Sequence, residues 1–180
     1  MNKIVILKAS PRKNGNSNAL AAAFAEEAKK AGASVTEYDT ANMKIAGCRG
    51  CYGCMTKGEC VFRDDFDKIA EDLRDADGIV IASPVYWYTF PAQIKAVIDR
   101  WFSLCVTGKD FSSKKAALLS CCEEETEETF DGIRFSFEKT MALMKAEIVG
   151  EVLIPKVSDV GEIKNTDGEK QARKLAGKFF

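Results

Sequence analysis

Four of the seven cysteines fall within thirteen positions, at Cys48, Cys51, Cys54 and Cys60. Glycines lie between them and allow the backbone turns that would bring the thiolates to one centre. Four thiolates at this spacing suit an iron–sulfur cluster or, less well, a structural zinc ion. The alternative is a set of reduced thiols that only shape a lid over a neighbouring site. An odd total with this clustering does not match the disulfide framework of a small secreted protein.

The chain contains no histidine. This excludes histidine-based catalytic triads, histidine metal ligands and the usual general base near neutral pH. Any chemistry must therefore come from a bound cofactor, from thiols, or from carboxylates and lysines.

A second group of polar residues fills a loop between an apolar run, 3–9, and a helical pattern that starts at Leu20. A strand, a loop and a helix in this order present backbone N–H groups to an anion. The loop adds hydroxyl, amide and guanidinium donors that suit a phosphate monoester. These donors are Ser10, Arg12, Asn14, Asn16, Ser17 and Asn18. The loop matches neither a Walker sequence nor the dinucleotide fingerprint. The alternative is an ordinary loop in which Ser17 caps the helix.

A third group, Pro84–Tyr88, follows the apolar run 78–82 and contains three consecutive aromatic residues. Their spacing does not fit a core, and a flat aromatic ligand would explain them by stacking. The alternative is an aromatic cap over the end of the sheet. Combined with the phosphate loop, this loop favours a phosphorylated flat ring. FMN fits better than NAD, because no acidic ribose-binding residue follows a glycine-rich turn.

Five strand-like segments alternate with helical patterns, which predicts a parallel sheet covered on both faces. The predicted strands are 3–9, 34–38, 78–82, 115–120 and 148–157, and helical spacing marks 20–31, 66–76, 91–105, 130–144 and 172–179. We expect a half-Rossmann arrangement or, as the better fit, a flavodoxin-like three-layer sandwich with strand order 2-1-3-4-5. In that order the two unusual loops meet at the carboxyl ends of strands 1 and 3.

Length and composition predict one globular domain over 1–180 that contains a cysteine-rich loop at 40–65. The net charge of −1, without a long basic run, argues against nucleic acid as a partner. No apolar run is long enough to span a membrane, and no signal-peptide pattern opens the chain. We therefore expect a cytoplasmic protein.

The two loops resemble those of the flavodoxin-like NAD(P)H-dependent FMN reductases. Ala9–Ser17 is similar to their Gly-Ser-Pro-Arg-x-x-Gly-Asn-Ser/Thr loop, with Ala9 where the family often has glycine. Ser83–Trp87, followed by Gln93–Lys95 and Ile98–Arg100, is similar to their second flavin segment. The similarity covers most of the chain in order and spacing. The cysteine run resembles the compact motif of the iron–sulfur flavoproteins, which belong to the same flavodoxin-like group.

The resemblance implies a set of FMN contacts. The phosphate would be held by Ser10, Arg12, Asn16, Ser17 and Asn18, and the isoalloxazine lined by Pro84, Val85, Tyr86 and Trp87. The loop Ser120-Cys121-Cys122 would give a third contact. Cys48, Cys51, Cys54 and Cys60 would hold a 4Fe–4S cluster. Because the family is commonly dimeric, a homodimer or homotetramer is expected, with the Trp87–Phe90 edge at the contact.

We therefore expect an FMN oxidoreductase that passes electrons from NAD(P)H to a quinone, a free flavin or a similar acceptor. The flavin carries the chemistry, so no side chain is expected to act as acid or base. One alternative is an iron–sulfur flavoprotein that transfers electrons with FMN and a 4Fe–4S cluster, to a small molecule or a redox protein. A non-enzymatic flavodoxin-like carrier would usually show a strongly acidic docking face, which a net charge of −1 argues against. A flavin-binding redox sensor is the third possibility.

Overall fold

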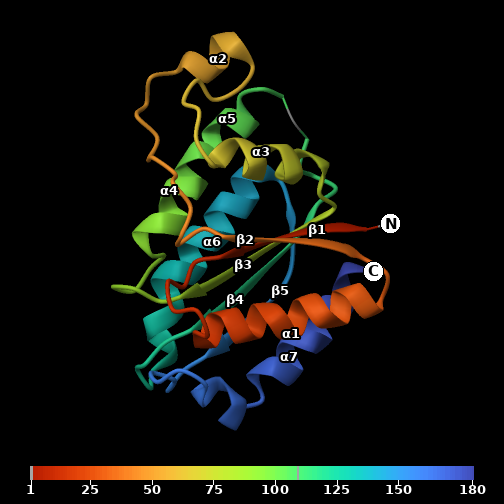
Figure 1. Ribbon diagram of the computed structural model, residues 1–180, viewed down its shortest axis with the longest axis vertical. Helices are drawn as coiled ribbons and strands as arrows, with labels where there is room; N and C mark the ends of the chain where they lie inside the picture. Colours follow the sequence, from red (N-terminus) through yellow and green to blue (C-terminus); the bar gives the residue numbers. More distant parts are fainter. Residues whose placement is uncertain (1, 109) are drawn as a thin grey trace.

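The computed structural model describes residues 2–108 and 110–180, and a five-stranded parallel sheet runs through its centre (Figure 1). The strands are β1 (Lys3–Lys8), β2 (Ser34–Asp39), β3 (Gly78–Pro84), β4 (Lys115–Cys121) and β5 (Glu147–Ile154). Their order is β2-β1-β3-β4-β5, and each neighbouring pair is parallel. The predicted flavodoxin-like order is therefore confirmed.

Helices cover both faces of the sheet (Figure 1). One face carries α1 (Asn16–Lys30) and α7 (Gly168–Ala176), which pack beside each other. The other face carries α3 (Phe66–Asp75), α4 (Ala92–Arg100) and α6 (Asp131–Met144). The shorter helical segments are α2 (Gly53–Lys57), α5 (Phe102–Cys105), η1 (Glu127–Phe130), η2 (Glu162–Asn165) and η3 (Gly177–Phe179). Right-handed crossovers between parallel strands require this placement on two faces.

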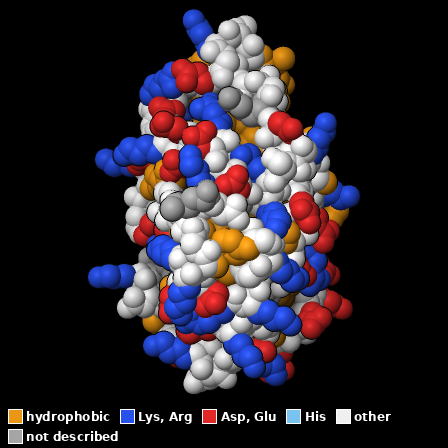
Figure 2. Space-filling view, turned by 90° about the vertical axis from the view of Figure 1, so that its right-hand side faces the viewer, with side chains coloured by type: hydrophobic (Ala, Val, Ile, Leu, Met, Phe, Trp, Pro, Cys, Tyr) orange, Lys and Arg blue, Asp and Glu red, His pale blue; other side chains and the backbone are white. Residues whose placement is uncertain are grey.

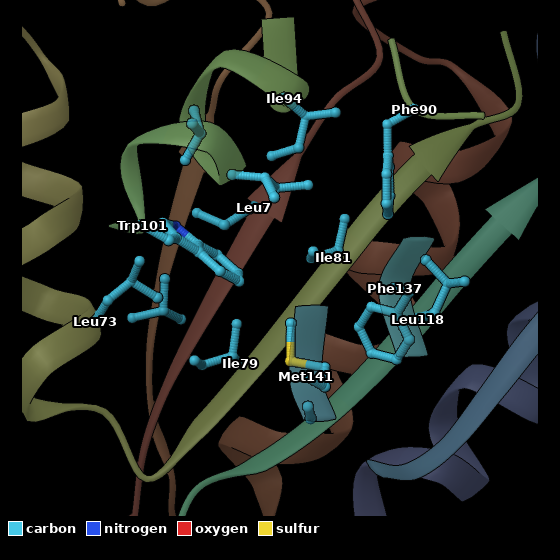
Figure 3. Close-up of a cluster of buried hydrophobic side chains, with 14 of the residues drawn as sticks. Leu7, Leu73, Ile79, Ile81, Phe90, Ile94, Trp101, Leu118, Phe137 and Met141 are labelled. Atoms are coloured by element: carbon cyan, nitrogen blue, oxygen red, sulfur yellow. The ribbon is translucent and has the colours of Figure 1, made fainter. Parts of the chain in front are cut away.

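The alternation of side chains along each strand divides the core into two layers. In β3, Ile79 and Ile81 face α3, α4 and α6, whereas Val80 and Ala82 face α1 and α7. Figure 3 shows the first layer, where Trp101 and Phe137 close over the strand residues. Both faces of a central strand are buried, which explains its continuous apolar sequence. Each fully buried Ile or Leu side chain contributes about 1.5–3 kcal/mol.

Two predicted segments differ from the structure. The stretch 40–65, expected to lack a regular element, contains the five-residue helix α2. Its flanking residues Tyr52 and Gly58 have φ of 56° and 75°, and these left-handed conformations limit the helix to little more than one turn. The single helix expected over 91–105 is divided at Trp101 into α4 and α5.

The face at the amino ends of the strands mixes both signs of charge, with only small hydrophobic areas between them (Figure 2). Such a surface produces no single-sign field, in agreement with the net charge of −1. Within the described residues, no helix is long and apolar enough to cross a lipid bilayer. The unusual loops lie at the opposite edge, at the carboxyl ends of the strands (Figure 1).

Candidate functional site

The loops that follow β1, β3, β4 and β5 enclose a cavity of about 110 Å³ at the carboxyl edge of the sheet. Nine residues expected to contact the cofactor line it: Ser10, Arg12, Asn16, Ser17, Pro84, Val85, Tyr86, Cys121 and Cys122. Four further lining residues were not among those candidates: Gly15, Glu123, Val157 and Ser158. Sequence reasoning did not place Val157 and Ser158 at the site, because the segment after β5 has no distinctive composition. The cavity lies at the switch point where ligands bind in this strand order.

The first turn of α1 forms the polar end of this cavity. The helix is capped by Gly15, not by Ser17, so the capping interpretation of Ser17 is wrong. The Ser17 side chain is buried at 1% exposure, and its hydroxyl has no hydrogen-bond partner. The first N–H groups of any helix also lack partners within the helix. A buried hydroxyl beside open N–H groups is a fitting environment for the oxygens of a phosphate.

Gly15 is required at its position because the loop closes tightly there. A Cβ atom on Gly15 would lie 2.5 Å from the Ser10 hydroxyl oxygen and 3.2 Å from the Arg12 carbonyl oxygen. The Ser10 hydroxyl also accepts a hydrogen bond of 3.3 Å from the Arg12 backbone N–H. The loop therefore folds into a narrow cradle that a larger residue at Gly15 would fill.

Two of the expected phosphate ligands instead connect the loop to the segment after β5. The Asn16 side-chain amide donates to the Asp159 carbonyl at 3.0 Å, and its oxygen accepts from the N–H groups of Gly161 and Ile163. Arg12 Nη1 donates to the Ser158 carbonyl at 2.6 Å. Asn16 therefore uses its side chain to hold the neighbouring segment in place. Arg12 contacts the same segment while its side chain lines the cavity.

Three expected residues lie outside the cavity. The Asn18 side chain donates to the Arg12 carbonyl at 3.0 Å and faces a broad groove on the other side of the loop. Ser120 is fully buried in β4, and its hydroxyl donates to the Ser83 carbonyl at 2.8 Å. Trp87 is 93% exposed and is not part of the cavity lining.

The aromatic loop after β3 is a tight turn with an unusual backbone. Tyr86 and Thr89 exchange two backbone hydrogen bonds of 3.0 and 3.1 Å, and the two residues between them are left-handed. Trp87 has φ of 48° and Tyr88 has φ of 64°. Two positive φ values in a row define a type I′ turn, which normally carries Asn-Gly. A non-glycine residue in this conformation costs about 1–2 kcal/mol.

Helix α6 supports this turn from below. A Cβ atom on Gly132 would lie 2.2 Å from the Tyr88 carbonyl oxygen, so only glycine allows the helix to approach this closely. The turn is therefore held in its strained form by packing, as is common at functional sites.

The two cysteines at the cavity are poor nucleophiles. Burial raises the pKa of the Cys121 thiol to about 12 and that of Cys122 to about 11. Both therefore remain protonated near neutral pH, whereas reactive cysteines require a lowered pKa.

The other four cysteines line a second cavity, which shares no residue with the first. Cys54 is buried, Cys60 is partly exposed, and Cys48 and Cys51 are exposed. Burial raises the pKa of the Cys54 thiol, and the neighbouring Cys60, Cys51 and Cys48 raise it further. This loop lies with α2 at one end of the molecule, away from the start of α1 (Figure 1).

The donor set of this second cavity consists of four thiols. In 2–108 and 110–180, no three Cys, Asp or Glu side chains are close enough to hold one metal ion. Thiolates are the ligands of 4Fe–4S clusters, so the four thiols around this cavity have the chemistry to hold one.

Comparison with known proteins identifies the family of this chain. Residues 2–128 match the model of the family described as NADPH-dependent FMN reductase. The chain belongs to this family.

Relatives of this FMN reductase family member include two proteins named iron–sulfur flavoprotein. The one from Methanosarcina thermophila is 39% identical over 112 residues, covering 62% of this chain and 58% of its own length. The one from Archaeoglobus fulgidus is 40% identical over 98 residues, covering 54% of this chain and 44% of its own length. The chain thus spans about half the length of these curated relatives.

Solved structures show the same fold as this FMN reductase family member. An azoreductase from Bacillus anthracis superposes with a TM-score of 0.78 at 23% identity, covering 99% of this chain and 100% of that one. An NAD(P)H:quinone oxidoreductase from Methanothermobacter marburgensis gives 0.77 at 21% identity, covering 97% and 94%.

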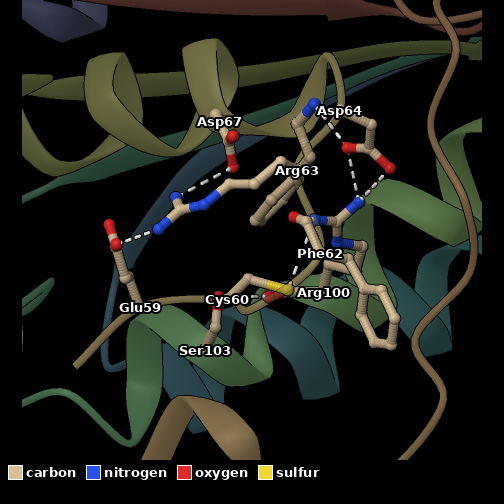
Figure 4. Close-up of polar contacts among 9 residues, drawn as sticks. Glu59, Cys60, Phe62, Arg63, Asp64, Asp67, Arg100 and Ser103 are labelled. Carbon is tan, nitrogen blue, oxygen red and sulfur yellow. Dashed lines mark hydrogen bonds and ion pairs between the residues drawn. The ribbon is translucent and has the colours of Figure 1, made fainter. Parts of the chain in front are cut away.

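One side chain at the cysteine cavity of this family member was given no role by sequence reasoning. Arg100, the last residue of α4, is buried and lines the cavity together with the four cysteines. Its Nη2 lies 3.3 Å from Cys60 Sγ, and its Nη1 pairs with Asp64 (Figure 4). A buried arginine ending an amphipathic helix is a weak signal in sequence, because such residues are usually exposed.

Proposed function

We propose that this chain is an FMN-dependent oxidoreductase that passes electrons from NAD(P)H to a quinone, a free flavin or a similar acceptor. The observation that carries this proposal is the buried, unpartnered Ser17 hydroxyl in the first turn of α1. A buried polar group without a partner is costly, and a phosphate in the cradle would supply the missing hydrogen bond. Family membership supports the same cofactor.

The chain's own residues bind and orient the cofactor in this proposal. Ser10, Arg12, Ser17 and the first N–H groups of α1 hold the phosphate, and Asn16 fixes the segment that closes the cradle. Pro84, Val85 and Tyr86 line the ring. Bound FMN supplies the hydride and one-electron chemistry, so no histidine is required. The cavity offers one terminal phosphate cradle, which favours FMN over FAD.

Mass spectrometry of the cofactor released from purified protein tests the flavin. We expect FMN, and recovery of FAD, or of no flavin after reconstitution, would contradict the proposal. Consumption of NADH or NADPH with quinone and flavin acceptors then tests the enzyme. A non-enzymatic flavodoxin-like carrier, or a redox sensor, would bind FMN and show no steady turnover.

A second function is favoured by the four cysteines around one cavity. We propose that Cys48, Cys51, Cys54 and Cys60 hold a 4Fe–4S cluster, so that the chain transfers electrons with FMN and the cluster. The names of the curated relatives support this proposal. The same cavity could instead remain a set of reduced thiols.

Iron and acid-labile sulfide per chain, measured on anaerobic protein, test the cluster. A variant in which any one of the four cysteines is changed to Ser should lose most of the iron and keep FMN, because the two cavities share no residue. Cys105→Ser is the matched control, since Cys105 lies in α5 with its sulfur against Met144. Near-zero iron in folded, FMN-loaded wild-type protein would contradict the cluster.

For assembly and location we propose a homodimer or homotetramer in the cytoplasm. Trp87 and Tyr88 expose large aromatic surfaces beside the FMN cavity, which supports a subunit contact there. The free cysteines suit a reducing compartment. Light scattering of wild-type protein and of Trp87→Ser tests the contact, because the variant should shift toward the monomer. An unchanged mass would remove Trp87 from the interface.

A further inference from the structure

One nitrogen of Arg100, Nη2, contacts a cysteine of the second cavity. Its side chain is 1% exposed, and Nη2 donates to Cys60 Sγ at 3.3 Å and to the Phe62 carbonyl at 2.7 Å (Figure 4). Cys60 is the last of the four cysteines in the chain. The arginine therefore connects the end of α4 to one sulfur of the proposed cluster site.

The neighbours of Arg100 fix the orientation of its guanidinium group. Asp64 accepts from Nη1 with both oxygens at 2.5 Å, and the Phe66 ring lies 4.4 Å from the guanidinium carbon. Asp64 is held in turn by the backbone N–H groups of Phe66 and Ala46, each at 3.0 Å. Burying a cation is costly unless it is paired, and Asp64 supplies that pair. Because Asp64 occupies Nη1, the ion pair turns its positive Nη2 side toward Cys60.

The planar guanidinium makes both contacts at once. Its donors form a rigid fork, so one arm can bind the carboxylate while the other donates to sulfur and carbonyl. Asp64 already pairs the buried charge, and the Phe62 carbonyl already accepts from Nη2. The additional contact to Cys60 therefore indicates a role at the sulfur itself.

We propose that Arg100 is a positioning residue that orients Cys60 and raises the reduction potential of a 4Fe–4S cluster held by the four cysteines. This inference rests on the second function proposed above. Reduction adds one electron to the cluster and its sulfurs, and no bond or proton changes. A fixed N–H donor stabilises the more negative reduced form more than the oxidised form. Hydrogen bonds to the sulfurs are among the factors that set such potentials.

The test uses full-length, FMN-loaded protein reconstituted anaerobically with iron and sulfide. Dithionite supplies the electrons in a redox titration, and electron paramagnetic resonance follows the reduced cluster. Arg100→Lys keeps a positive charge opposite Asp64, but an ammonium group lacks the second arm that reaches Cys60. Arg173→Lys is the matched control, because Arg173 pairs with Glu26 on the opposite face of the sheet.

We expect Arg100→Lys to keep its iron and FMN and to lower the equilibrium constant for reduction by about tenfold. For a one-electron couple this corresponds to a potential about 59 mV lower. Arg173→Lys should titrate like the wild type. If Arg100 had only a structural role, Arg100→Lys would change the thermal stability of the protein and leave the reduction potential of the cluster unchanged.

Three results would overturn the inference. A potential for Arg100→Lys equal to that of the wild type would remove the contact from redox tuning. Loss of iron from Arg100→Lys with FMN retained would show that the contact decides assembly instead. Wild-type protein without iron would refute the cluster function and this inference with it, whereas a loaded wild type with an insensitive variant refutes this inference alone. If Arg100→Lys fails to fold, Asp64→Asn combined with Arg100→Gln removes both charges together and carries the same expectation.

Discussion

Replacing Ser17 by alanine should have opposite effects on the FMN-free protein and on cofactor binding. The Ser17 hydroxyl is buried without a partner, and such a group costs about 1–3 kcal/mol. Ser17→Ala removes that cost, so we expect the free energy of unfolding of the FMN-free protein to rise by about 1 kcal/mol. In the FMN-bound protein the same hydroxyl would bind a charged phosphate, a contact of about 1.5–3 kcal/mol. Its loss should weaken FMN binding roughly 10- to 150-fold.

Ser120→Ala is the matched control, because Ser120 is equally buried but has a partner. Its hydroxyl donates to the Ser83 carbonyl, so its removal should lower stability by about 1 kcal/mol and leave FMN affinity in place. Urea unfolding of the FMN-free proteins and flavin fluorescence titration measure the two quantities. If Ser17→Ala destabilises the FMN-free protein and binds FMN as the wild type does, Ser17 is an ordinary core residue and the phosphate cradle is misplaced.

Three further predictions concern other parts of the chain. Arg12→Ala should weaken FMN binding roughly 10- to 150-fold in an equilibrium titration, because Arg12 lines the cavity. Its melting temperature should fall only by the loss of the exposed hydrogen bond to the Ser158 carbonyl; equal affinities would remove Arg12 from the site. Trp87→Asn with Tyr88→Gly should raise the free energy of unfolding of the monomer by about 1–2 kcal/mol in urea, because Asn-Gly suits the type I′ turn. Both proteins are compared at a concentration where they are monomeric, and a fall would show that the aromatic side chains stabilise the turn. Hydrogen bonds, first from Lys30 and second from Arg173, lower the pKa of Glu26 from 4.5 to about 2. The contribution of Glu26 to stability is therefore complete above pH 4.5 and is lost as pH falls toward 2. The melting temperatures of wild type and Glu26→Gln should converge over that range, and a constant difference would contradict this pKa shift.

The strand order was predictable because each strand carries its own signal. The β3 run Ile79-Val80-Ile81 is apolar on both faces, as only a central strand can be. The break at Trp101 was not predictable, because the apolar spacing of α4 continues through Trp101 to Leu104 in α5. Both residues are buried, so the sequence pattern resembles one continuous helix.

The position of a site residue was predictable where it depends only on residues nearby in the sequence. The loop 10–17 follows β1 directly, so its place at the sheet edge comes from the strand order. Asn16 has the composition of a phosphate ligand, but its partners lie 143 to 147 residues away and no local pattern reveals them. Trp87 lies in a turn that normally carries Asn-Gly, so the usual signal for that turn is absent.

Asn16 joins the loop after β1 to a segment that is synthesised much later. Its partners Asp159, Gly161 and Ile163 leave the ribosome at least 143 residues after it. At about 5–20 residues per second, this delay is roughly 7–30 s. Throughout that interval the nascent chain carries the phosphate loop without the segment that holds it. Because β5 must also pair with β4 before the segment reaches its place, the loop that carries Asn16 gains these contacts only after residues 159–163 have been synthesised.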